Sequence, residues 1–184
     1  MVPVSSDPLR PLLDAAVEGD DHSVAELVRR TQPAVWRVCA ALGSRGDEED
    51  LVQEVYLRAL PAAARYRGDA PVLPWLLAIA RHVCADYVRR RQRQRRVLER
   101  LRVLTTADAV VHGDSVDDLV ASLDRDRREA FVLTQVTGLS YAEADEVCGV
   151  PIGTIRSRVA RARADLLDAL AADEPGYGAS SSSS

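Results

Sequence analysis

Apolar residues recur at helical spacing along most of this chain, which predicts a series of amphipathic helices. In the first half we expect helices over residues 12–18, 23–42 and 48–60, and a fourth from about Trp75 into a run of arginines. Ser23 is the expected N-cap of the second helix, and Pro74 suits the first turn of the fourth. Because no segment predicts a strand, the pattern favours an all-α fold.

The helical pattern is lost over residues 103–118, which are polar, rich in aspartate and too poor in apolar residues to fold alone. We therefore expect two small helical domains joined by a flexible linker, the second being a helix-turn-helix domain. The expected boundaries are residues 1–10 for a disordered N-terminus, 11–100 for the first domain, 101–116 for the linker, 117–172 for the second domain and 173–184 for a disordered, serine-rich tail.

The helix-turn-helix prediction rests on residues 139–163, LSYAEADEVCGVPIGTIRSRVARAR. Ser140 and Glu143 have the spacing of a capping box, so a short helix is expected to begin there. Gly149 permits the left-handed conformation of a tight turn, after which a second helix follows. The stripe of this second helix that we expect to be buried comprises Ile155, Val159, Ala162 and Leu166.

The other side of the second helix carries arginines around a small side chain, which suits a DNA major groove. We expect Arg156 and Arg161 to read guanine while Ala160 allows close approach. Phosphate contacts are expected from the other polar side chains of this helix, which are Thr154, Ser157, Arg158 and Arg163. The alternative is a solvated arginine face on an ordinary bundle helix.

The positive charge of the chain is concentrated in one segment. All 24 basic residues are arginine, although the net charge is −4. A GC-rich genome accounts for much of the arginine bias, so position is more informative than composition. Residues 81–100 hold eight arginines against Asp86 and Glu99, a local formal charge of +6. Such a run favours contact with nucleic-acid phosphates, with a disordered basic linker as the alternative.

Other classes of protein find little support in the sequence. No apolar run is long enough to span a membrane and no secretion signal is recognisable, so a cytoplasmic protein is expected. Cys39, Cys84 and Cys148 are isolated among apolar residues, which predicts buried reduced thiols and neither a metal site nor a cofactor. Without a phosphate-binding loop, a catalytic triad or an acid pair, we do not expect an enzyme.

Two segments upstream of the helix-turn-helix indicate which class of DNA-binding protein this is. They are EEDLVQEVYLRAL at residues 48–60 and YRGDAPVLPWLLAIARHVCADYVRRRQR at residues 66–93. The first resembles the polymerase-binding helix of region two in the extracytoplasmic-function group (group IV) of bacterial sigma factors. The second resembles the promoter-melting segment of the same region, and the helix-turn-helix stretch resembles region four. The likeness covers about residues 10–170, and the three motifs follow one another in the family's order. Within the family, the sequence is similar to the actinobacterial sigma factor C type.

The resemblance implies two sets of binding residues in the first domain. A polar helix face would meet the β′ clamp helices of core RNA polymerase, and it consists of Asp50, Gln53, Glu54 and Arg58. Residues Leu51, Val55 and Leu57 of that helix are expected to pack inward. A second set would hold the melted non-template strand at the minus-ten element, and it consists of Tyr66, Arg67, Arg81, His82, Asp86, Arg89 and Arg90. Trp75 is a candidate for base stacking, but core packing is favoured because Leu76, Ile79 and Val83 extend the same apolar surface.

By this resemblance the chain is a promoter-specificity subunit. It would bind core polymerase through β′ and the β flap, read minus-thirty-five duplex DNA with the second domain and support melting at minus ten. An anti-sigma factor would be a further partner, as for many members of the family. The alternative is a stand-alone helix-turn-helix transcriptional regulator, which would leave the two upstream segments unexplained.

Two positions depart from the family's pattern. His82 stands where many relatives have asparagine. Asp145 stands where a small residue usually lies between the two helices of the motif, and a buried unpaired carboxylate is costly. We therefore expect either a small rotation or shift of the helix, or a pair between Asp145 and Arg158 or Arg161.

Overall fold

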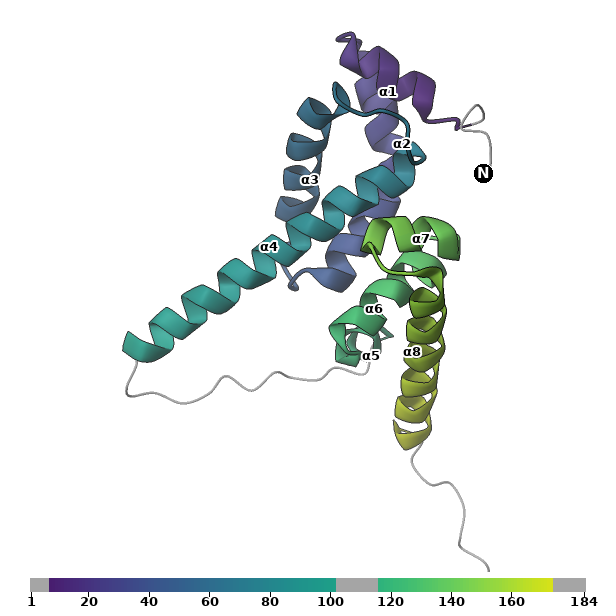
Figure 1. Ribbon diagram of the computed structural model, residues 1–184. Coiled ribbons are helices and arrows are strands. Elements are labelled where there is room, and N and C mark those ends of the chain that lie inside the picture. Colours follow the sequence, from purple (N-terminus) through teal and green to yellow (C-terminus); the bar gives the residue numbers. More distant parts are fainter. Residues whose placement is uncertain (1–6, 102–115, 174–184) are drawn as a thin grey trace, which may run out of the picture.

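The computed structural model describes residues 7–101 and 116–173, and every regular element within these ranges is helical (Figure 1). The elements are α1 Arg10–Val17, α2 Asp21–Leu42, α3 Glu48–Ala63, α4 Val72–Leu101, α5 Val116–Ser122, α6 Arg125–Phe131, the π-helical turn η2 Val132–Val136, α7 Tyr141–Cys148 and α8 Ile152–Asp173. The all-α prediction is confirmed. Most of the expected terminal segments and of the expected linker lies outside the described residues.

Helices α1, α2 and α4 begin two or three residues earlier than the sequence suggested. Asp20, and not Ser23, is the N-cap of α2, because its carboxylate accepts hydrogen bonds from the amides of His22 and Ser23. Helix α4 begins at Val72, which places Pro74 in its first turn, where a missing amide proton leaves no helical hydrogen bond unmade. From there α4 continues without a break through the arginine run.

Helices α1–α4, here called the first half, bury one face of each helix. On α3, Leu51 and Val55 point into the core as predicted. The prediction for Leu57 is wrong, because its side chain is 61% exposed. Leu57 follows Gln53 by one helical turn and Asp50 by two, so helix geometry puts it on their solvent-facing side.

Elements α5–α8, here called the second half, contain the expected helix-turn-helix. Ser140 and Glu143 form the predicted capping box at the start of α7. Gly149 ends that helix in the left-handed conformation with φ of 66°. On α8, Ile155, Val159 and Ala162 are buried as expected, and Leu166 is half-buried. The turn between α7 and α8 is therefore set by local sequence and by the buried stripe.

The two halves share one hydrophobic core. Buried residues of α2, α3 and α4, such as Val35, Val55 and Leu77, belong to the same cluster as Leu133 and Ile155 of the second half. Helix α7 packs on α4, and η2 packs on α2 (Figure 1). A smaller cluster of Leu13, Leu27, Ala63 and Val72 lies under α1. The apolar contacts therefore hold the halves together as well as each half by itself.

The C-terminal part of α4 leaves this packed body and projects from it as a single helix (Figure 1). Its arginines are therefore displayed on a helix rather than on an irregular linker. Among the described helices, none combines the length and hydropathy that a membrane span needs. The three cysteines, Cys39, Cys84 and Cys148, are buried free thiols as predicted.

Candidate nucleic-acid interface

Helix α8 presents two unpaired arginines on its outer face. Arg156 and Arg161 are exposed, and neither forms a hydrogen bond or ion pair within the described residues. Ala160 lies exposed between them, as does Ser157, whose hydroxyl donates a 2.9 Å hydrogen bond to the carbonyl of Thr154. Two free guanidinium groups around a methyl side chain leave this face ready to approach base edges and phosphates.

The other two arginines of α8 are held by the second half itself. Arg158 is half-buried and forms an ion pair with Asp126 of α6. Arg163 donates to the side-chain oxygen of Gln135 at 2.5 Å. The sequence did not separate these arginines from Arg156 and Arg161, because helical spacing alone does not show which neighbour lies beside each side chain.

Asp145 does not occupy the buried position between the two helices. Its neighbour Ala144 is fully buried, whereas Asp145 is half-exposed. No ion pair involving Asp145 is found within residues 7–101 and 116–173, and Arg158 pairs with Asp126 instead. Within the described residues the structure therefore shows Ala144 turned inward and no carboxylate–arginine pair at Asp145.

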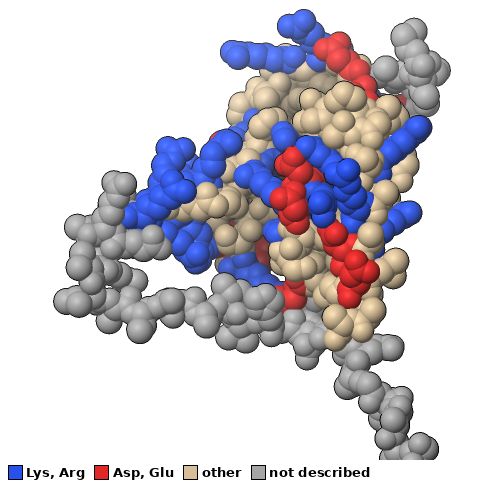
Figure 2. Space-filling view, turned by 60° about the horizontal axis from the view of Figure 1, so that its bottom comes forward, with Lys and Arg blue, Asp and Glu red and all other residues tan. Residues whose placement is uncertain are grey.

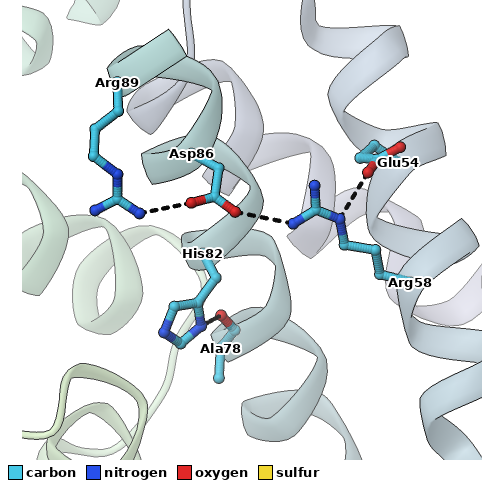
Figure 3. Close-up of polar contacts among 6 residues, drawn as sticks. All are labelled: Glu54, Arg58, Ala78, His82, Asp86 and Arg89. Atoms are coloured by element: carbon cyan, nitrogen blue, oxygen red, sulfur yellow. Dashed lines mark hydrogen bonds and ion pairs between the residues drawn. The ribbon is translucent and has the colours of Figure 1, made fainter.

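Helix α4 displays a polar row on the side that faces α3 and solvent (Figure 3). The Asp86 carboxylate binds two arginines: Oδ1 lies 2.6 Å from Nη2 of Arg89, and Oδ2 lies 3.1 Å from Nη1 of Arg58. The Arg89 guanidinium, and then Arg58, hold the pKa of Asp86 below its usual value. Asp86 therefore stays ionised in the physiological pH range, and it partly neutralises Arg89.

His82 lies one turn before Asp86 on the exposed side of α4 (Figure 3). Its Nδ1 is 2.7 Å from the carbonyl oxygen of Ala78, so the proton of the neutral ring is assigned to Nδ1. The other ring nitrogen, Nε2, is then a hydrogen-bond acceptor. Asparagine in this position would offer both a donor and an acceptor, so the two side chains differ in which base edges they match.

The loop before α4 borders a cavity of about 510 Å³. The ring centroids of Tyr66 and Trp75 lie 5.1 Å apart at the wall of the cavity. Arg67, which follows Tyr66 in the loop, also lines the cavity. Trp75 is half-buried and packs against the core, as predicted, while one edge reaches the cavity. Burial is the first cause that raises the pKa of Tyr66, so its hydroxyl stays protonated at neutral pH. Aromatic rings beside arginine suit an unstacked base.

The projecting part of α4 forms a basic surface. Arginines cover it at the left of Figure 2, apart from the mixed acidic and basic surface of the second half. Arg89 and Arg90 are exposed, while Arg91 turns back to Asp47 with an Nη1–Oδ2 distance of 2.7 Å. The segment is helical, which contradicts the alternative of a disordered basic linker over residues 89–96.

Comparison with known proteins identifies both halves. Residues 27–94 match the model of Sigma-70 region 2, and residues 113–166 match the model of Sigma-70, region 4. The chain is 44% identical over 165 residues to the ECF RNA polymerase sigma factor SigC of Mycobacterium tuberculosis, which covers 86% of this chain and 87% of that protein. The chain belongs to the extracytoplasmic-function family of sigma factors.

Two solved structures share the fold of this sigma factor. CnrH, in complex with the cytosolic domain of CnrY, superimposes with a TM-score of 0.71 at 30% identity, covering 90% of this chain and 98% of that one. The sigma factor RpoE of Bartonella quintana, in complex with the anti-sigma factor NepR, gives a TM-score of 0.65 at 29% identity, covering 82% and 98%. The sequence resemblance to the family is thereby confirmed.

The sigma factor presents a mixed surface on α3. Asp50 and Gln53 are exposed, and Glu54 and Arg58 are half-exposed and paired, with Arg58 Nε 2.7 Å from Glu54 Oε1. Leu57 lies among them, a residue that the sequence interpretation had placed in the core. The helical spacing from Asp50 and Gln53 was the signal that would have found it. An apolar side chain ringed by polar groups is typical of a protein-binding surface.

In this conformation of the sigma factor, the second half covers part of the expected minus-ten surface. Arg81 pairs with Glu129 of α6, whose side chain is only 7% exposed. Glu146 and Val147 of α7 line the cavity that Tyr66 and Trp75 border. Sequence reasoning identified Arg81 as a DNA contact but not Glu129 as its partner, because the two residues lie in different halves. Arg81 is thus brought to the interface between the halves rather than to the solvent beside His82.

Proposed function

We propose that this sigma factor confers promoter specificity through two separate DNA contacts. The observation that carries the proposal is that Arg156 and Arg161 on α8 have no partner among residues 7–101 and 116–173, on the same chain as the projecting basic helix α4. The first surface fits duplex DNA and the second fits a single strand whose phosphates are accessible. A subunit that reads two promoter elements at a fixed separation needs both.

At the minus-thirty-five element, α8 is proposed to enter the major groove. Arg156 and Arg161 would contact guanine edges, and Ala160 would permit the approach. Phosphates would be held by Thr154, Ser157, Arg158 and Arg163, the last two after exchanging their present partners for DNA.

At the minus-ten element, the first half is proposed to hold the non-template strand. The cavity beside Tyr66 and Arg67 would receive an extruded base. Contacts between the base and the cavity would offset the cost of unstacking it, which is about a few kcal/mol. His82 and Asp86 would face neighbouring bases, and phosphates would be held by Arg81, Arg89 and Arg90. Arg81 becomes available only after the second half has moved away from it.

Core RNA polymerase is the proposed partner of the α3 surface. Asp50, Gln53, Glu54 and Arg58 would contact the β′ clamp helices, and the second half would contact the β flap. An anti-sigma factor is proposed as a second partner, since RpoE, a sigma factor of similar fold, was solved with the anti-sigma factor NepR bound. The sigma factor would act in the cytoplasm as a binding subunit, with no catalytic step of its own.

Run-off transcription with purified core polymerase tests this function. The sigma factor should support initiation from a promoter selected from genomic fragments, and Arg156→Ala with Arg161→Ala should abolish that selection. Arg29→Ala with Arg37→Ala is the matched control, because it removes the same charge from exposed positions of α2 outside the proposed contacts. A stand-alone regulator would instead bind duplex DNA by itself and give no core-dependent transcript, and that result would overturn the proposal.

A further inference from the structure

A continuous chain of charged side chains joins the polymerase-facing helix α3 to the DNA-facing helix α4 (Figure 3). Glu54 pairs with Arg58 on α3, Arg58 reaches across to Asp86 on α4, and Asp86 pairs with Arg89. The three contacts measure 2.7, 3.1 and 2.6 Å. Arg58 is the link between the two helices.

Each inner member of this chain divides its interaction between two partners. The Arg58 guanidinium is shared by the carboxylates of Glu54 and Asp86, and the Asp86 carboxylate is shared by Arg58 and Arg89. A group that loses one partner interacts more strongly with the other, because charges at this separation attract or repel without full screening. The state of Glu54 therefore influences how firmly Asp86 holds Arg89.

All four side chains are reachable from solvent. Their exposed fractions lie between 39% and 54%, and the hollow between α3 and α4 is lined by Glu54, Arg58 and Asp86 together with Asp50 and Arg90. A basic side chain of a docking protein can thus reach Glu54, and a phosphate can reach Arg89. The two outer ends of the chain point to two different partners.

We propose that Arg58 is a positioning residue that couples polymerase docking to promoter binding. A polymerase cation that pairs with Glu54 frees Arg58 to bind Asp86 fully, and Asp86 then releases Arg89 to a phosphate of the non-template strand. By linkage, a strand phosphate held by Arg89 also strengthens docking at Glu54. The inference rests on the proposed function for the identity of the two partners, and on the contacts above for the coupling.

The coupling is expected to be modest. Exposed ion pairs contribute little because water screens them, so release of Arg89 should change strand affinity by about threefold. Substitutions of Arg58 should leave the fold intact, because its side chain is 39% exposed and lies outside the hydrophobic core. The effect is therefore measurable in folded variants.

The first test uses the full-length protein without polymerase. Glu54→Gln removes the charge that competes for Arg58 and so imitates docking. Fluorescence anisotropy with a fluorescein-labelled random single-stranded DNA pool at low salt should show about threefold tighter binding than Glu26→Gln. Glu26 is the control, because it has the same charge and pairs with arginines of its own helix, Arg29 and Arg30, as Glu54 pairs with Arg58, but it has no link to α4. Equal affinities of the two variants would overturn the coupling.

A second test asks whether Arg58 carries the coupling from Glu54 to Arg89. In an Arg58→Met background, Glu54→Gln should no longer change strand affinity, whereas Arg58→Lys should preserve part of the change. In assembled holoenzyme, Arg58→Met should weaken strand binding, because Asp86 then holds Arg89 alone. In an Asp86→Asn background, where nothing holds Arg89, Arg58→Met should no longer have this effect. An equal loss in both backgrounds would mean that Arg58 acts only as a direct polymerase contact. If the first test succeeds but core polymerase gives no initiation, the proposed function fails while the intramolecular coupling stands.

Discussion

At the scale of single residues, His82 is the side chain whose chemistry bears most directly on base choice. In the neutral ring, Nδ1–H donates to the Ala78 carbonyl and Nε2 presents an acceptor to DNA. We predict that His82→Asn changes the preferred base at one minus-ten position, by about 1 kcal/mol or more between bases. Binding of holoenzyme to single strands that differ at one position measures this. His22→Asn, on the exposed surface of α2, should leave the preferences unchanged.

Asp145 gives a prediction about stability at the same scale. Because it is half-exposed and has no ion pair in the described part of the chain, Asp145→Ala should be neutral or stabilising, within about 0.5 kcal/mol of neutrality. Ala144→Asp is the contrasting change, since it buries a carboxylate and should destabilise the second half severely. Thermal unfolding followed by circular dichroism compares them. A large loss for Asp145→Ala would contradict the placement of this side chain.

The sequence predicted the chemistry of these residues better than their surroundings. Arg156, Arg158, Arg161 and Arg163 cannot be told apart by residue type and helical position alone. Within the described residues, however, Arg156 and Arg161 have no partner, while Arg158 pairs with Asp126 and Arg163 with Gln135. Which arginine pairs is decided by how α8 packs on α6, and a periodic pattern specifies only the buried side of a helix. The DNA roles of all four stay predictions.

At the scale of elements, two glycines of the helix-turn-helix should respond to alanine in opposite ways. Gly149 has φ of 66°, where a Cβ is strained even though space is open, so Gly149→Ala should cost about 1 kcal/mol. Gly153 lies within α8 with no neighbour near an added Cβ, so Gly153→Ala should stabilise by about 0.5 kcal/mol. Equilibrium urea unfolding measures both, and changes of the same sign would contradict the assigned conformations.

Helix identity was predictable because it depends on local periodicity, while helix ends were less so. Asp20 and Ser23 are both good capping residues, and only the backbone path shows that Asp20 takes the amides. The capping box at Ser140 was found because both of its partners lie within one turn of sequence. The hydrophobicity of Leu57 predicts burial, but its helical position places it on the solvent-facing side of α3 with Asp50 and Gln53, where it is exposed.

At the scale of the whole molecule, the pair between Arg81 and Glu129 ties the halves together beside their shared core. Glu129→Gln leaves the Arg81 charge poorly compensated, at a cost near the lower end of about 3–5 kcal/mol. We predict a larger radius of gyration by small-angle X-ray scattering and faster amide exchange in α7. Glu26→Gln, which removes the same charge from a half-buried position whose pairs lie within α2, should alter neither quantity. An unchanged radius would show that apolar packing alone holds the halves together.

The association of the halves could not be predicted from the sequence. The helical pattern predicts that apolar residues such as Leu77 on α4 and Val147 on α7 are buried. It does not predict whether the residues that they pack against belong to the same half. Glu129 carries no sequence signal either, since a carboxylate on a polar helix is ordinary. The division into regions 2 and 4 was predictable because each region carries its own motifs.

The unbroken course of α4 has a mechanical consequence. Its N-terminal turns are clamped in the core, whereas the stretch from Arg89 to Leu101 extends about 18 Å beyond them at the usual helical rise. A stiff rod anchored at one end acts as a lever, so a tilt of about 10° at its base would carry the tip by about 3 Å. Small adjustments in the packing around Leu77 and Val83 would thus be magnified at the arginines.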